Sequence, residues 1–171
     1  MAAVPATTPY MGLPRFDASD SSSIWVHLNK LADQVDQMYG PWQTYEPVWS
    51  QSSGTVLNVG SGSLTGRYIK IGRVVHAHIR LERAADSNIG SGLWVWTLPP
   101  VQPRSWNMIG GGFSMARDGN WFGGGVFPVS QTSVGAIVGD LGRVSNTVPL
   151  GDTRHAAGDW YSLQITYEAA N

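Results

Sequence analysis

The sequence predicts an all-β protein, an antiparallel β-sandwich or jelly-roll-like knob that follows one short helix. Charged residues make up only 13% of the 171 residues, about half of the usual share, whereas glycine and tryptophan are frequent, with 21 and 8 copies. After the helix, the period of the apolar residues changes from about three and a half to two. Seven to nine short strands with turn residues between them, and no second helix, favour a sandwich or jelly roll.

These patterns divide the chain into three parts. Residues 1–21 form an extended, proline-rich arm, residues 22–40 an oligomerising helix, and residues 41–171 the β-sandwich knob. The sequence has no apolar run long enough to cross a bilayer, no Lys/Arg cluster for nucleic acid and no secretory signal pattern. Cysteine is absent, which excludes disulfides and thiolate metal sites. We therefore expect no nucleic-acid partner and no membrane insertion.

The predicted helix, Ser22–Tyr39, has apolar residues spaced four, three, four and three apart. They occupy the a and d positions of a heptad seam: Ile24, Leu28, Leu31, Val35 and Met38. A helix this short is marginal alone in water, so it needs a partner surface. We favour a self-associating neck that gathers several copies of the chain. The alternative is an amphipathic helix that lies on the sheet of its own domain.

The N-terminal arm carries three prolines and several turn-forming residues, so it cannot be helical. It is either a disordered tail or an anchor that grips a larger assembly through apolar and aromatic side chains on an extended segment. The candidate anchoring residues are Tyr10, Met11, Leu13 and Phe16.

The clearest strand pair is Arg67–Ile71 with Arg73–Leu81, which turn at Gly72. In the second of these strands, Val75, Ala77, Ile79 and Leu81 alternate with Val74, His76, His78 and Arg80, which is typical of a half-buried antiparallel strand. The other expected strands are Trp42–Ser50, Thr55–Val59, Gly92–Leu98, Met108–Ala116, Trp121–Val129, Ser133–Val138 and Trp160–Tyr167. Both faces of Gly92–Leu98 are apolar, which suits a sandwich centre or a subunit contact.

The sequence offers little catalytic chemistry. The segment Gly112-Phe113-Ser114-Met115-Ala116 lacks the second glycine of a nucleophile elbow and does not precede a helix. We expect no enzymatic activity and no cofactor. His76 and His78 share one face of a strand and form a weak candidate for half of a metal site, which a symmetric assembly could complete. The simpler interpretation is that both histidines face solvent.

Aromatic and polar residues gather around the expected Gly-rich hairpin. The candidate ligand-binding residues are Trp106, Asp118, Asn120 and Trp121. An aromatic face that stacks on a sugar ring, with carboxylate and amide groups for its hydroxyls, is typical of a saccharide site. The alternative is that these tryptophans only fill the core.

Three stretches of the sequence form a set that spans most of the chain. They are Gly12-Leu13-Pro14-Arg15 followed by Leu31-Ala32-Asp33-x-x-Asp36, then Gly66-Arg67-Tyr68-x-Lys70-Ile71-Gly72-x-Val74-Val75, and finally Gly158-Asp159-x-x-x-Leu163-x-Ile165-x-Tyr167-Glu168-Ala169-Ala170. Together they resemble short minor tail or tail-fibre-like proteins of bacteriophages, in particular of phages with actinobacterial hosts. The resemblance implies an arm that docks on the virion, a helix that trimerises and a distal β knob, but it carries no specific binding residue over.

On this interpretation the chain is a virion structural protein, a homotrimer that attaches the tail to a glycan on the host cell surface. It would contact other virion proteins through its arm, assemble in the host cytoplasm and leave by lysis. One alternative is a capsid decoration or head-fibre protein with no receptor role. Another is a small polysaccharide-degrading enzyme, which would need two carboxylates at a set separation.

Overall fold

The computed structural model describes residues 24–38, 40–90, 93–117, 120–140, 143–144 and 157–170. Its elements are α1 (Ile24–Met38), β1 (Gln43–Tyr45), β2 (Trp49–Gln51), β3 (Ser63–Ile71), β4 (Val74–Glu82), β5 (Trp94–Thr97), a 3₁₀ turn η1 (Trp106–Met108), β6 (Gly110–Arg117), β7 (Asn120–Ser130), β8 (Ser133–Asp140), β9 (Arg143–Val144) and β10 (Trp160–Glu168). The predicted antiparallel all-β class is confirmed, as is a helix ahead of the strands.

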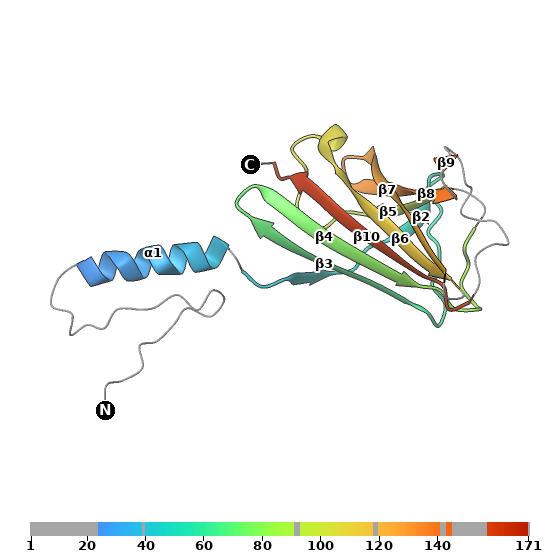
Figure 1. Ribbon diagram of the computed structural model, residues 1–171, viewed down its shortest axis with the longest axis horizontal. Coiled ribbons are helices and arrows are strands. Elements are labelled where there is room, and N and C mark those ends of the chain that lie inside the picture. Colours follow the sequence, from blue (N-terminus) through green and yellow to red (C-terminus); the bar gives the residue numbers. More distant parts are fainter. Residues whose placement is uncertain are drawn as a thin grey trace, which may run out of the picture.

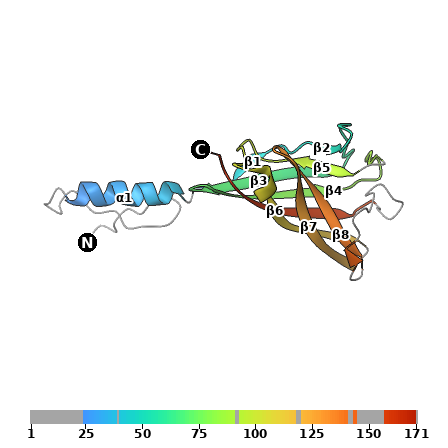
Figure 2. The same cartoon turned by 90° about the horizontal axis from the view of Figure 1, so that it is seen from above.

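Nine strands form one curled antiparallel sheet in the order β1-β3-β4-β10-β6-β7-β8-β5-β2, and β9 pairs with β8. β1 and β2 stand at opposite ends of this order, although only residues 46–48 separate them along the chain. The sheet therefore has to curl until its two edges approach each other (Figures 1 and 2). The Tyr45 hydroxyl of β1 donates to the Thr97 carbonyl of β5, 3.4 Å away, across this approach. The jelly-roll connectivity stays a prediction.

Glycines in β6 and β7 suit this curl. Gly110–Gly112 and Gly123–Gly125 leave both strands partly without side chains, and Gly112 pairs directly with Gly125. Glycine within a strand commonly marks a bend or a close approach of two backbones. Gly111 is such an approach, because a Cβ built there would lie 1.8 Å from the backbone oxygen of Gln164 in β10. Only glycine fits at this position.

The core lies inside the curl and is rich in aromatic rings. Trp49, Trp94 and Trp96, from β2 and β5, are all fully buried. The Trp94 ring meets those of Trp49 and Tyr161 edge-on, with centroids 4.8 and 5.3 Å apart. Such pairs contribute about 0.5–1.5 kcal/mol each beyond the burial of their area. These contacts join the β5–β2 end of the sheet order to β10 near its centre.

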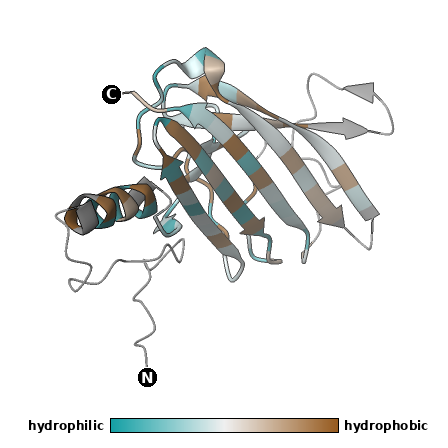
Figure 3. Ribbon diagram, turned by 60° about the vertical axis from the view of Figure 1, so that its left-hand side comes forward, coloured by the Kyte–Doolittle hydropathy of each residue, from teal (hydrophilic) through white to brown (hydrophobic). Residues whose placement is uncertain are grey.

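The alternation predicted for the strand now labelled β4 is confirmed. Its inward residues are buried: Val75, Ala77, Ile79 and Leu81. Figure 3 shows the corresponding bands of hydrophobic and hydrophilic residues along neighbouring strands. The turn at Gly72 is also confirmed, with φ of +58°, a conformation that favours glycine.

Two predicted strands differ from the structure. Trp42–Ser50 is divided into β1 and β2, with the buried Pro47 between them. Proline lacks the N–H that a continuous ladder needs, so the chain leaves one end of the sheet order there and joins the other. Thr55–Val59 forms no strand and makes only isolated bridges, Ser50 with Val56 and Asn58 with Asn88.

The predicted apolar character of both faces of Gly92–Leu98 is seen at β5, where Trp94 and Val95 are both buried. Val95 pairs with Gly135 of β8, and a Cβ at Gly135 would lie 2.6 Å from the Phe127 ring. The ring therefore occupies the space above Gly135, beside Val95. An intrachain aromatic residue accounts for the covered second face, without a subunit contact.

α1 extends beyond the end of the sheet and covers neither of its faces (Figures 1 and 2). On the predicted seam, Leu31 is 56% exposed and Leu28 is 36% exposed. Asp36 lies off the seam and is only 3% exposed. The anchoring residues predicted in the arm, and the side chains of Ile24 and Met38, lie outside the described residues. The coiled coil and the trimer stay predictions.

Neighbouring glycines offer a test of the close approach between β6 and β10. We expect Gly111→Ala to lower the free energy of unfolding by about 1–3 kcal/mol, because its methyl group would overlap the Gln164 carbonyl. Gly112→Ala, with no atom within 4 Å of its Cβ, should change that energy by less than about 0.5 kcal/mol. Urea denaturation followed by tryptophan fluorescence measures both. Equal losses in the two variants would contradict the register of β6 on β10.

Candidate ligand-binding site

The side of β3, β4 and β10 that is turned away from the core is called the outer face below. Strand pairing places its residues in rows across the three strands, with Arg67, His78 and Gln164 in one row and Thr65, Arg80 and Ser162 in the next. Alternation exposes these positions because their sequence neighbours are committed to the core. The outer face is therefore mostly polar, although the same three strands carry apolar residues on the side that faces the core.

A shallow hollow of about 400 Å³ lies in this face. Its floor is the β4–β10 ladder at Ala77 and Ile165, whose side chains point into the core. Its walls are the outward side chains of Trp42, Arg67, His76, His78, Gln164 and Thr166. On the far side of β10, β6 presents Gly110 and Gly112, where no atom would lie within 4 Å of a Cβ. The hollow is therefore open toward β6.

Two arginines on the outer face lie against tryptophan rings. The Arg67 guanidinium is 5.0 Å from the centroid of the Trp42 ring, and that of Arg80 is 5.9 Å from the Trp160 ring. A cation over an aromatic face is attracted by the quadrupole of the ring. Trp42 is still 47% exposed, so part of its surface is open to solvent.

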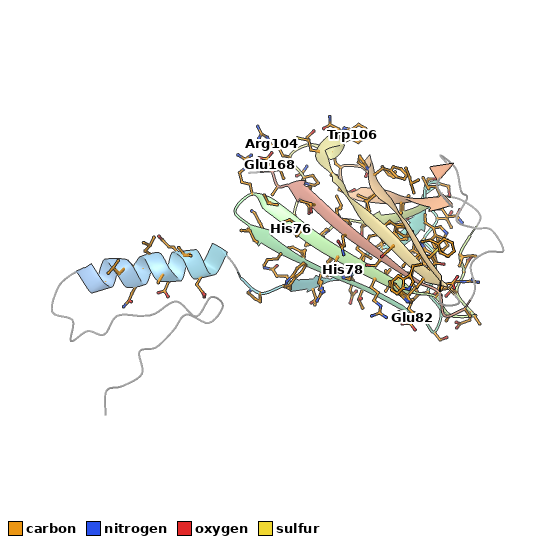
Figure 4. All side chains as sticks on the ribbon, viewed as in Figure 1. His76, His78, Glu82, Arg104, Trp106 and Glu168 are labelled. Atoms are coloured by element: carbon orange, nitrogen blue, oxygen red, sulfur yellow. The ribbon has the colours of Figure 1, made fainter. Side chains whose placement is uncertain are left out.

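The carboxylates of the outer face lie at the ends of its strands. Glu82 is the last residue of β4, and Glu168 is the last residue of β10 (Figure 4). Glu168 already pairs with Arg73 and Arg104, at 3.0 and 3.1 Å. Among the described residues, no carboxylate forms an ion pair with Arg67 or Arg80. The middle of the face is therefore electropositive.

Both histidines lie along β4 within the outer face (Figure 4). His76 Nδ1 lies 3.0 Å from the Thr166 hydroxyl, and His78 Nε2 lies 2.8 Å from the Ser162 hydroxyl. Burial lowers the pKa of His78 below its ordinary 6.5, and the positive charges of Arg67 and Arg80 lower it further. His78 is consequently neutral at pH 7 and acts as a hydrogen-bonding group.

Among the described residues, no third side chain joins His76 and His78 to form a metal site. In the ranges given above, no group of three or more His, Cys, Asp or Glu side chains gathers closely enough to hold an ion. The predicted half-site at His76 and His78 would still depend on other copies of the chain, and it stays a prediction.

The structure does not bring the two predicted ligand-binding tryptophans together. Trp106 lies on η1, just before β6, and Trp121 lies at the start of β7, after β6 has ended. The eight residues of β6 put roughly 25 Å between these positions. Figure 4 shows Trp106 near Glu168, whereas strand pairing places Trp121 at the end of the sheet marked by Glu82.

The remaining predicted ligand-binding groups cannot be placed beside either ring. Asp118 and the side chain of Asn120 lie outside the described residues. Trp121 is 68% exposed, and its ring meets Trp160 edge-on with centroids 4.8 Å apart. Trp121 therefore belongs to an exposed aromatic pair beside Arg80, and not to a site shared with Trp106.

Sequence reasoning did not single out Trp42, Arg67, Arg80 or Gln164 as site residues. The outward alternation of β4 was visible in the sequence, and so was that of β10. The pairing of these two strands was not visible, because His78 and Ser162 are 84 residues apart along the chain. Alternation identifies the face on which a residue lies, but it does not identify the neighbouring strand.

Comparisons of the chain with known protein families, with curated proteins and with solved structures found no match. Within the part of the chain that is described, no helix has the length and apolar character needed to span a membrane.

The positive charge beside His78 can be tested by titration. Arg67→Gln should raise the pKa of His78 toward 6.5, because one of two repelling cations is removed, yet the pKa should stay below 6.5 because burial remains. A pH titration of the ring signals by NMR, assigned with His78→Gln, measures this shift. Arg104→Gln, which removes the same charge at the end of the sheet, should leave the pKa of His78 unchanged. An unchanged midpoint in Arg67→Gln would place Arg67 away from the imidazole.

Proposed function

We propose that this chain is a virion structural protein of a bacteriophage tail, in which α1 joins three copies and the β domain attaches to a glycan on the host surface. The main support for the proposal comes from α1. This helix projects beyond the sheet, and Leu28 and Leu31 on its apolar seam are exposed (Figure 1). The phage setting rests on the resemblance of the three sequence stretches described above. The role is one of binding rather than catalysis.

Self-association through α1 supplies what the helix lacks in a single chain. An isolated helix of 15 residues is marginal in water, and most helical stability in proteins comes from packing an apolar face. Leu28 and Leu31 are partly exposed at a and d positions, and full burial of a leucine contributes about 1.5–3 kcal/mol relative to exposure. Leucine at a with isoleucine at d, as in Leu28 and Ile24, favours three or four strands. Valine at a with leucine at d, as in Val35 and Leu31, favours two, so the measured mass of the particle decides the number of copies.

The β domain carries exposed aromatic rings beside polar groups. Trp42 and Trp121 are both exposed on the outer side of the curled sheet, and histidine, glutamine and hydroxyl side chains lie beside Trp42. Aromatic surface next to groups that can bond hydroxyls suits a saccharide. Three such domains on one rigid neck would bind a repetitive cell surface far more tightly than one, because later binding events become intramolecular.

The neck is tested by placing a charge on its seam. Leu31→Asp should convert the trimer to monomers, because three carboxylates would be buried together at one d position. Light scattering coupled to size-exclusion chromatography measures the mass. Lys30→Asp introduces the same residue one position away, at an exposed position off the seam, and should keep the trimer. Retention of the wild-type mass by Leu31→Asp would refute the neck.

The virion setting is tested by labelling intact particles with gold-conjugated antibodies against residues 41–171, viewed by electron microscopy. Gold at the tail end is the expected result. Gold across the head would instead indicate a decoration or head-fibre protein. No gold, with a serum proven on the pure protein, would contradict the virion proposal.

A further inference from the structure

We propose that the hollow in the outer face binds an acidic saccharide, whose sugar ring packs against Trp42 and whose anionic group is held by Arg67. The inference rests on the glycan-binding function proposed above and gives it a place and a ligand class. The place differs from the one that the sequence suggested, at Trp106 and Trp121.

Charge is the first argument for an acidic ligand. Arg67 and Arg80 are neighbours across the β3–β4 ladder, and among the described residues neither forms an ion pair with a carboxylate. A guanidinium group left without a carboxylate is well suited to bind one from a ligand, because its planar fork matches that geometry. Of the carboxylates at the strand ends, Glu168 is paired with Arg73 and Arg104, and Glu82 forms no ion pair with either Arg67 or Arg80.

Shape and hydrogen bonding are the second argument. The hollow, at about 400 Å³, falls within the range of about 300–1,000 Å³ typical of small-molecule sites. Around Arg67 it offers two imidazoles, the Gln164 amide and the Thr166 hydroxyl, which together can donate to and accept from sugar hydroxyls. The bare glycines of β6 leave a path along which a longer saccharide could continue.

A single-stranded nucleic acid would also use an aromatic ring beside a cation. Such proteins, however, follow the phosphate backbone with a continuous basic groove, and their affinity depends on many phosphate contacts. Here the chain has a formal net charge of −1, and the middle of the outer face carries only two unpaired arginines, with carboxylates at the ends of its strands. One or a few anionic groups among many hydroxyls fit this pattern better than a phosphate at every unit.

The first experiment is isothermal titration calorimetry of the full chain with three probes of similar length. These are an oligogalacturonate, the neutral maltohexaose and an oligothymidylate. We expect the oligogalacturonate to bind at least about tenfold more tightly than maltohexaose at low salt, and its affinity to fall as sodium chloride is added.

Variants then locate the site. Arg67→Gln and Trp42→Ala should each weaken binding of the oligogalacturonate by about tenfold or more, because one removes a charge-assisted hydrogen bond and the other the packing surface. Arg104→Gln removes the same charge near the end of β10 and should leave the affinity unchanged. All three positions are solvent-exposed, and the melting temperature of each variant checks that it folds.

Three results would overturn the proposal. Equal affinity for the acidic and neutral saccharides would remove the acidic class and leave glycan binding itself in place. Tighter binding of the oligothymidylate would assign the face to nucleic acid. No binding of the oligogalacturonate would remove the site, whereas the neck and the virion setting are decided separately by particle mass and gold labelling.

Discussion

The curl of the sheet depends on the short connection between β1 and β2. These strands lie at opposite ends of the strand order, yet only residues 46–48 join them, so the sheet has to bring its edges together. Proline at position 47 ends one ladder, and the glycines of β6 and β7 suit the bend, with Gly111 close against the backbone of β10. Once the sheet curls, its concave side encloses the buried tryptophans and its other side is turned entirely outward.

This arrangement separates the residues that fill the core from those that face solvent. Inward residues of β4 and β10 fill the core together with rings from β2 and β5, so the outward residues of the same strands have no packing role to fulfil. They are free to be arginine, histidine, glutamine and threonine, with hydroxyl–imidazole contacts that bind β4 to β10. α1 extends beyond the end of the sheet, and Leu28 and Leu31 on its predicted seam are exposed.

The sequence predicted those features that depend on near neighbours. The helix, the turn at Gly72 and the inward set of β4 follow from local period and turn chemistry. The outer face depends on which strands lie side by side, and residues 84 apart, such as His78 and Ser162, meet only through the strand order. For the same reason the sequence predicts one site for Trp106 and Trp121, since closeness along the chain does not show that β6 runs between them.

The most direct test of the outer face uses the tryptophan side chains as reporters. Trp42, Trp106 and Trp121 are exposed at different places on the β domain, and each has an indole N–H that gives its own signal in a spectrum of protein labelled with ¹⁵N-tryptophan. With signals assigned by single Trp→Phe variants, we expect oligogalacturonate to move the Trp42 signal first and to leave that of Trp121, at the Glu82 end of the sheet, in place. A shift of Trp121 with Trp42 unmoved would place the ligand at the opposite end of the sheet and contradict the proposed site.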